Sequence, residues 1–151
     1  MNSWSKQAYL APDLPDPICQ GSMVHGVSTP AVLGVGQPLF FVNPHNEHNR
    51  VNVTLSMSAT GGQRWSQLLP VATSNGHIHC SGYSGLVQFQ SGQIGVAFDD
   101  GGPVHGSGDA CEGSNGTFVL IELQPGNPTR VATTAAKVDD DICVSCVIPF
   151  S

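Results

Sequence analysis

The residue types that bind metal ions are present in this sequence, but their spacing does not match a metal site. His77, His79 and Cys80 lie close together, and Cys143 and Cys146 form a C-x-x-C pair. A structural zinc site takes four such ligands, usually as two closely spaced pairs. The sequence has no second pair with that spacing, and the C-x-x-C pair lacks the helix-opening context of a thioredoxin-like redox site. We therefore predict no metal ion and no cofactor.

Charged residues are few and mostly acidic. The 151 residues include 5 Lys and Arg and 11 Asp and Glu, so the formal net charge is −6 and only 11% of the residues are charged. Nucleic-acid-binding proteins gather their basic residues into patches. Here the basic residues are scattered, at Lys6, Arg50, Arg64, Arg130 and Lys137. The sequence thus predicts neither a nucleic-acid partner nor a membrane span, because no apolar run approaches the required length.

The compartment of the protein stays open at this stage. Five cysteines cannot all pair within one chain. Two glycosylation sequons, which begin at Asn52 and Asn115, would suit a secreted protein, but such triplets are common. Residues 1–9 lack the hydrophobic stretch of a signal peptide and resemble the middle of a domain more than its start.

The composition predicts an all-β fold made of short strands. Glycine (18) and proline (11) are abundant, and apolar runs alternate with turn residues without a helical period. The expected strands are 21–25, 38–42, 50–59, 64–70, 85–90, 93–99 and 117–123. We expect Ser91-Gly92 to form a two-residue hairpin loop between the fifth and sixth of them. Residues 1–125 are taken as the folded part, and 126–151 as a tail of uncertain order.

A short internal repeat suggests a repeated β unit. Trp4-Ser5 recurs as Trp65-Ser66, and Cys19-Gln-Gly recurs as Cys80-Ser-Gly, both with an offset of 61 residues. A fixed period that spans several strands is typical of a radial β array such as a propeller.

Several segments, in order from about residue 14 to 123, resemble the exo-α-sialidases (neuraminidases). The segment that starts at Pro15, Pro-Asp-Pro-Ile-Cys-Gln-Gly-Ser, is similar to a strand entry of that family. The segment Ser58–Trp65 resembles an Asp-box, S-x-D-x-G-x-T/S-W, a turn between the third and fourth strands of a blade. It departs from that pattern with Thr60 at the aspartate position and Arg64 at the Thr/Ser position. Further similar segments are 39–44 with 50–56, 82–89 and 92–99.

This resemblance implies a partial six-bladed β-propeller of the sialidase type. The chain would hold about one full blade and most of the last blade. The family's first two active-site arginines, its acid/base aspartate and the glutamate that partners its tyrosine would all lie outside these residues. We therefore expect a C-terminal fragment that associates with the missing N-terminal blades or with itself.

The resemblance also assigns site residues. Arg50 resembles the third member of the arginine triad that binds the substrate carboxylate, and Tyr83 resembles the catalytic nucleophile. Asp99, or its neighbour Asp100, falls near the position at which the family has an acidic residue that orients its first arginine. Each has a simpler reading: a solvated strand arginine, a packing tyrosine, and aspartates that form the turn before Gly101-Gly102.

The remaining aromatic and histidine candidates have simpler readings too. Trp4 and Trp65 are better read as core aromatics of Asp-box turns than as sugar-stacking platforms. His45 and His48 are better read as solvated turn residues than as part of a substrate rim.

The implied activity is hydrolysis of terminal α-linked sialic acids, on glycans or glycolipids, with retention through a tyrosine nucleophile. As a fragment, the chain is expected to be inactive alone. The alternatives are a non-catalytic sialic-acid-binding or degenerate propeller module, and an unrelated β-sandwich.

Overall fold

The described part of the chain contains only strands, turns and loops. The computed structural model describes residues 10–27, 37–71, 79–103, 115–123 and 131–138, with only the backbone described at 79, 80, 102, 103, 115 and 131–138. The eight strands are β1 (Ser22–His25), β2 (Leu39–Pro44), β3 (Val53–Ser58), β4 (Ser66–Pro70), β5 (His79–Gln88), β6 (Ile94–Pro103), β7 (Asn115–Leu123) and β8 (Val131–Val138). The all-β prediction is therefore confirmed. None of the described residues forms a helix long and apolar enough to cross a bilayer.

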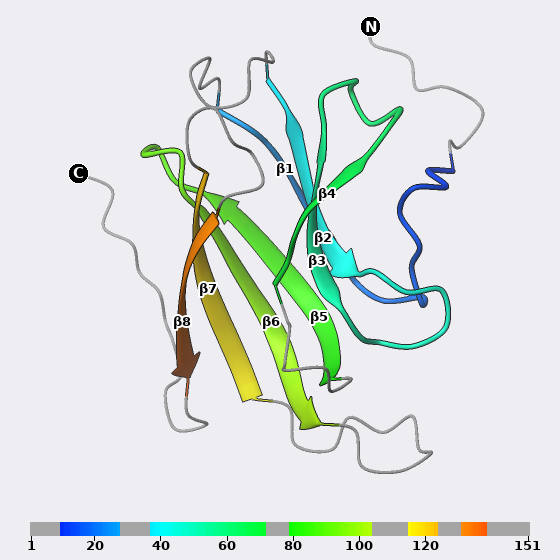
Figure 1. Cartoon of the computed structure of the whole chain (residues 1–151), viewed down its shortest axis with the longest axis vertical. Helices are drawn as coiled ribbons and strands as arrows, with labels where there is room; N and C mark the ends of the chain where they lie inside the picture. The colour runs from blue at the N-terminus through cyan, green and yellow to red at the C-terminus, as the bar shows by residue number, and fades with distance from the viewer. Residues whose placement is uncertain (1–9, 28–36, 72–78, 104–114, 124–130, 139–151) are drawn as a thin grey trace, which may run out of the picture.

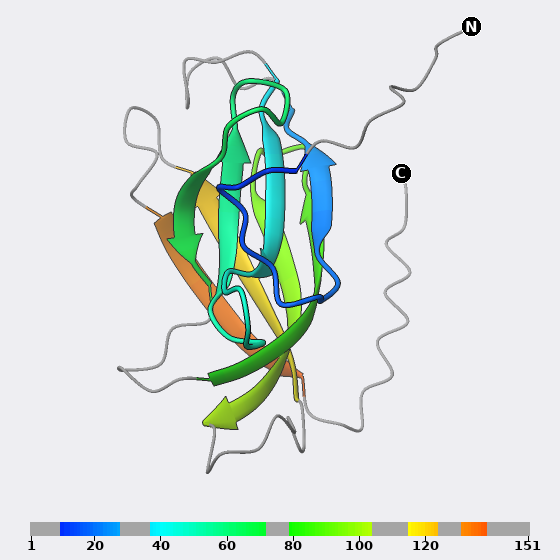
Figure 2. The ribbon, with the colours of Figure 1, turned by 90° about the vertical axis from the view of Figure 1, so that its right-hand side faces the viewer.

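The strands form two antiparallel sheets of four, each in sequential order: β1-β2-β3-β4 and β5-β6-β7-β8. The two sheets pack against each other. They appear next to each other in Figure 1, and the first sheet lies in front of the second in Figure 2. Such a meander pairs each strand with its sequence neighbour, so neither sheet takes a strand from the other.

One apolar core joins the two sheets. Period-2 alternation puts Phe40 and Val42 of β2 on the same face, and Ile94, Val96 and Phe98 of β6 on another. These side chains are all buried and belong to one cluster with residues of β3 and β7. The alternation that predicted the strands therefore also identifies the faces that pack together.

The segment before β1 covers the outer face of the first sheet. Figure 2 shows this dark blue segment running across strands β2 and β3. The side-chain amide of Asn43, which is fully buried, donates to the carbonyl of Pro15 (2.9 Å) and to the carboxylate of Asp16 (3.1 Å). Phe41 packs its ring on that of Trp65, with 5.9 Å between centroids. Trp65 thus has the packing role expected for it, whereas Trp4 lies outside the described residues.

The structure differs from the sequence prediction in the β5–β6 hairpin and at the C-terminal end. The hairpin is present, and the amide of Phe89 donates to the carbonyl of Gln93 (2.9 Å) beyond the ends of the two strands. The loop between these two residues therefore has three residues, 90–92. The amide of Gly92 donates to the carbonyl of Phe89 (2.9 Å), and Gly92 has a φ of 89°. A tight turn followed by a left-handed glycine is the usual three-residue hairpin loop. Residues 131–138, which we placed in the tail, form β8 along β7.

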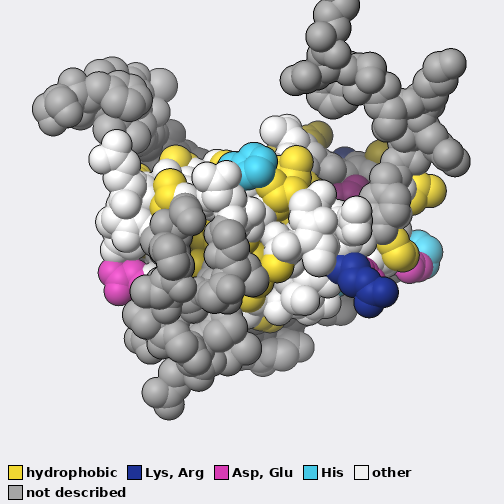
Figure 3. All heavy atoms as spheres, turned by 90° about the horizontal axis from the view of Figure 1, so that it is seen from above, with side chains coloured by type: hydrophobic (Ala, Val, Ile, Leu, Met, Phe, Trp, Pro, Cys, Tyr) yellow, Lys and Arg dark blue, Asp and Glu magenta, His cyan; other side chains and the backbone are white. Residues whose placement is uncertain are grey.

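Charged side chains are sparse among the described residues on the face that Figure 3 shows. Apolar side chains there lie among white atoms, which are the backbone and other side chains. The exposed large apolar residues include Met23, Val27, Val87 and the site residue Tyr83.

The turn between β3 and β4 is held by hydrogen bonds of the Ser58, Thr60 and Trp65 side chains to the backbone. Ser58 Oγ accepts from the amides of Thr60 (3.2 Å) and Gly62 (2.9 Å). Thr60 Oγ1 accepts from the amide of Arg64 (2.9 Å), and the Trp65 indole donates to the carbonyl of Gly62 (3.0 Å). As the sequence predicts, this turn joins the third and fourth strands of its sheet.

Removal of the Thr60 hydroxyl is expected to weaken this turn. We expect Thr60→Ala to lower the free energy of unfolding by about 0.5–1.5 kcal/mol, because the amide of Arg64 loses its acceptor. Thr60→Asp and Thr60→Ser each retain an oxygen and should stay near the parent value. Urea titrations of the four proteins measure the difference, and an unchanged Thr60→Ala variant would contradict this role.

Candidate functional site

Arg50 is held at the entrance to β3 by a loop with its own hydrogen bonds. The side chain of Asn46 accepts from the amides of His48 (2.9 Å) and Asn49 (2.8 Å), which fixes the turn before Arg50. Val51, directly after it, is buried. The loop therefore has an anchored backbone, while the Arg50 side chain itself is exposed.

Backbone hydrogen bonds tie this loop and the neighbouring segments to β5. The carbonyl of Arg50 accepts from the amide of Ser81 (2.8 Å). Ser84 Oγ lies 3.2 Å from the carbonyl oxygen of Val42, and the amide of Ser84 donates to the carbonyl of Gln20 (3.4 Å). Residues on both sides of Tyr83 are thus attached to the first sheet.

Tyr83 lies at an irregularity of the β5–β6 ladder. Ser81 pairs with Asp100 and Ser84 pairs with Phe98, so Gly82 and Tyr83 together face the single residue Asp99. A two-against-one arrangement is a β-bulge, which changes the direction of the side chains beside it. The Tyr83 side chain is 51% exposed and is therefore accessible to a ligand.

The structure brings Arg50 and Tyr83 together, although 33 residues separate them in the sequence. The guanidinium carbon of Arg50 lies over the ring of Tyr83, 5.3 Å from its centroid. This cation–π contact joins a loop of the first sheet to a strand of the second. At an exposed position it is worth about 0.5–1 kcal/mol, so a ligand that binds the guanidinium more strongly can replace it.

Acidic and thiol groups complete the surroundings of this pair. Asp99 packs on Gly82, where an added Cβ would lie 3.4 Å from the Asp99 carboxylate. Burial raises the pKa of the Cys19 thiol, and the positive charge of the nearby Arg50 opposes that rise. Asp16 holds the amide of Cys19 through its side chain (2.9 Å). Cys19 and Asp16 were not among the sequence-predicted site residues, although both lie in the segment that starts at Pro15.

Asp100, the second acidic candidate, follows Asp99 on β6. Asp100 pairs in register with Ser81 and Asn115 in the β5–β6–β7 ladder. His77, Cys111, Cys143 and Cys146 lie outside the described residues, as do the side chains of His79 and Cys80. Among the side chains that are described, no group of three or more His, Cys, Asp or Glu is placed to hold a metal ion.

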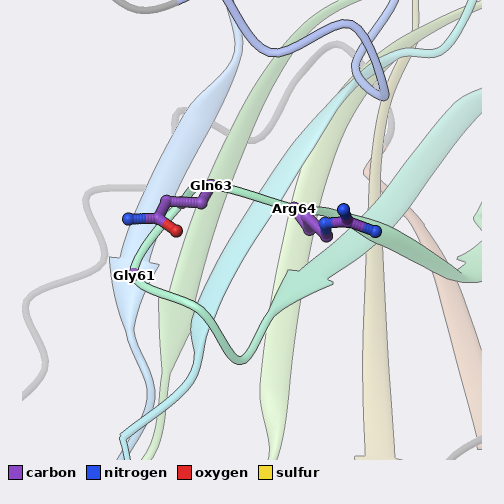
Figure 4. Close-up of a pocket in the computed structure, with 4 residues that line it drawn as sticks. Gly61, Gln63 and Arg64 are labelled. Carbon is purple, nitrogen blue, oxygen red and sulfur yellow. The ribbon is translucent and has the colours of Figure 1, made fainter.

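A surface hollow lies at the β3–β4 turn, far from the Arg50–Tyr83 pair. It is lined by Gly61, Gly62, Gln63 and Arg64, and the side chains of Gln63 and Arg64 point away from each other (Figure 4). This turn follows β3, whereas Arg50 precedes it, so the length of a six-residue strand, about 20 Å, separates the two places. The hollow therefore belongs to the turn and not to the candidate site.

His45 occupies a half-buried position at the end of β2, and its ring is best placed when neutral. Burial lowers the pKa of His45 below its ordinary value. Its Nε2 lies 2.6 Å from the side-chain nitrogen of Gln67, and a neutral ring can accept this hydrogen bond. The sequence predicts that His45 and His48 are solvated turn residues. His45 is instead half-buried, whereas His48 is exposed as expected.

The pKa of His45 gives stability a defined pH dependence. The unfolded chain binds the proton more tightly than the folded chain, so the contribution is fully present above pH about 6.5 and is lost as the pH falls below it. We expect the midpoint temperature of thermal unfolding to decrease when the pH is lowered from about 7.5 to about 5.5. The His45→Gln variant should show a smaller decrease. His48→Gln is the matched control and should leave it unchanged. Identical pH profiles for the parent and His45→Gln would contradict this assignment.

Comparison of the chain with models of known protein families and with curated proteins finds no match. The candidate site therefore rests on the resemblance of short segments described above and on the geometry of its residues.

Proposed function

We propose that this chain is the C-terminal part of an exo-α-sialidase-type β-propeller, and that Arg50 and Tyr83 contribute to its sialic-acid site. The observation that carries the proposal is the contact between these two side chains. The family resemblance selected each of them separately, and they come from different sheets.

The chemistry of the pair suits sialic acid. The anomeric carbon of this sugar carries a carboxylate, and a guanidinium can bind two carboxylate oxygens at once. A carboxylate nucleophile would meet that charge at the same carbon, whereas a phenol that is deprotonated as it attacks avoids the repulsion. Arg50 would hold the carboxylate while Tyr83 Oη forms a bond to the anomeric carbon and the glycosidic oxygen leaves with a proton from a general acid.

The sheet topology supports the same proposal. Each sheet is a four-stranded antiparallel meander, and a four-stranded sheet is the unit of a propeller blade. The start of β1 follows Cys19-Gln-Gly, and Cys80-Ser-Gly lies at the start of β5, so the 61-residue repeat falls at corresponding places in the two sheets. β8 extends the proposed last blade from three strands to four.

A second candidate, a module that binds sialic acid without hydrolysing it, is favoured by one observation. The turn that resembles an Asp-box has Thr60 in place of the aspartate, which favours a degenerate module. The resemblance also implies that the glutamate that partners the tyrosine, two further arginines and the acid/base aspartate lie outside these residues. We therefore expect these 151 residues to bind sialosides of glycans or glycolipids and not to turn them over.

Two measurements on the full chain test the proposal and separate the candidates. Isothermal titration with N-acetylneuraminic acid should show binding, and N-acetylglucosamine, which lacks the carboxylate, should show none. A fluorogenic sialoside should stay uncleaved. Hydrolysis that Tyr83→Phe abolishes would show that the chain alone is an enzyme. Equal binding of the acidic and the neutral sugar would remove the basis of both candidates.

A further inference from the structure

The sequon Asn52-Val53-Thr54 lies where the loop that carries Arg50 enters β3. Asn52 has a φ of 61°, in the left-handed region that asparagine adopts more readily than most residues with a side chain. Its side chain is exposed, whereas Val51 and Val53 on either side are buried. The turn therefore directs the Asn52 amide away from the core.

The side-chain amide of Asn52 takes no part in the hydrogen bonds of the described structure. The main-chain carbonyl of Asn52 accepts from the amide of His45 (3.0 Å) and from the hydroxyl of Thr54 (2.8 Å), so the backbone alone holds this turn. Asn43 and Asn46 differ, since their side chains hold the segment before β1 and the loop before Arg50. A substituent on the Asn52 amide would thus break no hydrogen bond among the described residues.

We propose that Asn52 is an acceptor for an N-linked oligosaccharide. The donor is a lipid-diphosphate-linked oligosaccharide. The amide nitrogen of Asn52 forms a bond to the anomeric carbon of the sugar and loses one proton. The bond from that carbon to the diphosphate oxygen breaks, and the lipid diphosphate leaves with the electron pair. This assignment does not depend on the sialidase proposal.

The burial of Thr54 determines whether the glycan is transferred before or after folding. The sequon threonine is 2% exposed in the fold, and its hydroxyl is engaged with the carbonyl of Asn52. A transferase that must recognise this hydroxyl can reach it only before β3 joins its sheet. The nascent chain is therefore the substrate, and the folded chain is not.

The second sequon lies in a different setting. Asn115 is the first residue of β7 and is in register with Asp100 of β6. Thr117, the third residue of this sequon, is also buried. A glycan added before folding must afterwards be accommodated by the fold. Asn115 lies within a ladder between two strands, whereas Asn52 lies outside the strands, so we assign the glycan to Asn52.

Translation of the full chain behind a cleavable secretory leader, in the presence of microsomes, tests the assignment. We expect one mobility shift that peptide N-glycosidase removes. Asn52→Gly, which suits the left-handed backbone, and Thr54→Val, which keeps the shape of the side chain, should both abolish it. Thr54→Ser and Asn115→Gln should retain it. Because transfer precedes folding, a variant that fails to fold still reports on the acceptor.

Two results would overturn the proposal: no shift in the parent chain, or a shift that Asn115→Gln abolishes and Asn52→Gly retains. A second shift that only Asn115→Gln removes would leave the Asn52 acceptor in place and overturn the choice of Asn52 over Asn115. The folded chain, added after translation to the solubilised transferase, should gain no glycan, and modification of the folded chain would overturn the proposed timing.

Discussion

Arg50→Ala is expected to reduce the affinity of the chain for N-acetylneuraminic acid by at least about tenfold. A charge-assisted hydrogen bond contributes about 1.5–3 kcal/mol, and 1.4 kcal/mol corresponds to a factor of ten. The guanidinium of Arg50 is exposed, and its contact with the Tyr83 ring is weak enough for a carboxylate to replace it. Isothermal titration of the two proteins measures the loss.

Arg64→Ala is the matched control for this prediction. Arg64 is also an exposed arginine, but it lies at the opposite end of β3, and the turn uses only its backbone groups in the hydrogen bonds with Thr60. Its removal changes the net charge by the same amount as Arg50→Ala. Equal losses of affinity in the two variants would mean that the anion responds to overall charge and not to a site at Arg50.

Leu55→Ala is expected to lower the free energy of unfolding by about 2–5 kcal/mol, the usual range for a large-to-small change in a core. Leu55 is fully buried in the middle of β3 and belongs to the cluster that joins the two sheets. Such a loss is a large part of the stability of an ordinary domain. Chemical denaturation followed by circular dichroism would measure it.

The comparison for Leu55 is Leu10, the same residue type with 86% of its surface exposed. Leu10→Ala should change stability by less than about 0.5 kcal/mol, as surface substitutions usually do. If Leu55→Ala proved equally harmless, the two sheets could not share one cooperative core.

The sequence predicted the strands that carry alternating large apolar residues, and missed the one that does not. β6 could be found from Ile94, Val96 and Phe98, which lie on one buried face. β8, with the sequence Val-Ala-Thr-Thr-Ala-Ala-Lys-Val, has small and polar residues and is a strand because it pairs along β7. Pairing of that kind is a tertiary effect, which local propensity does not contain.

For the candidate site, the sequence predicted the two main residues but not the contact between them. Arg50 and Tyr83 were identified through the family resemblance, and no spacing rule states that they should touch. Their contact depends on the hydrogen bond between the carbonyl of Arg50 and the amide of Ser81, and on the bulge at Gly82 and Tyr83. The hydrogen bond forms only when the two sheets have packed, and the bulge forms when β5 pairs with β6. The hydrogen bond between Asp16 and Cys19 differs, because it is a local contact between residues three apart in the sequence.

The division of Arg50 and Tyr83 between two sheets has a consequence for energetic coupling. A ligand that engages both side chains binds only the arrangement in which the sheets are docked, so it must also stabilise that docking by the same free energy. The reciprocal also holds: a partner that holds the sheets together would tighten ligand binding without touching the ligand. The amide of Ser81, which donates across this junction, would then exchange its hydrogen more slowly in the presence of either.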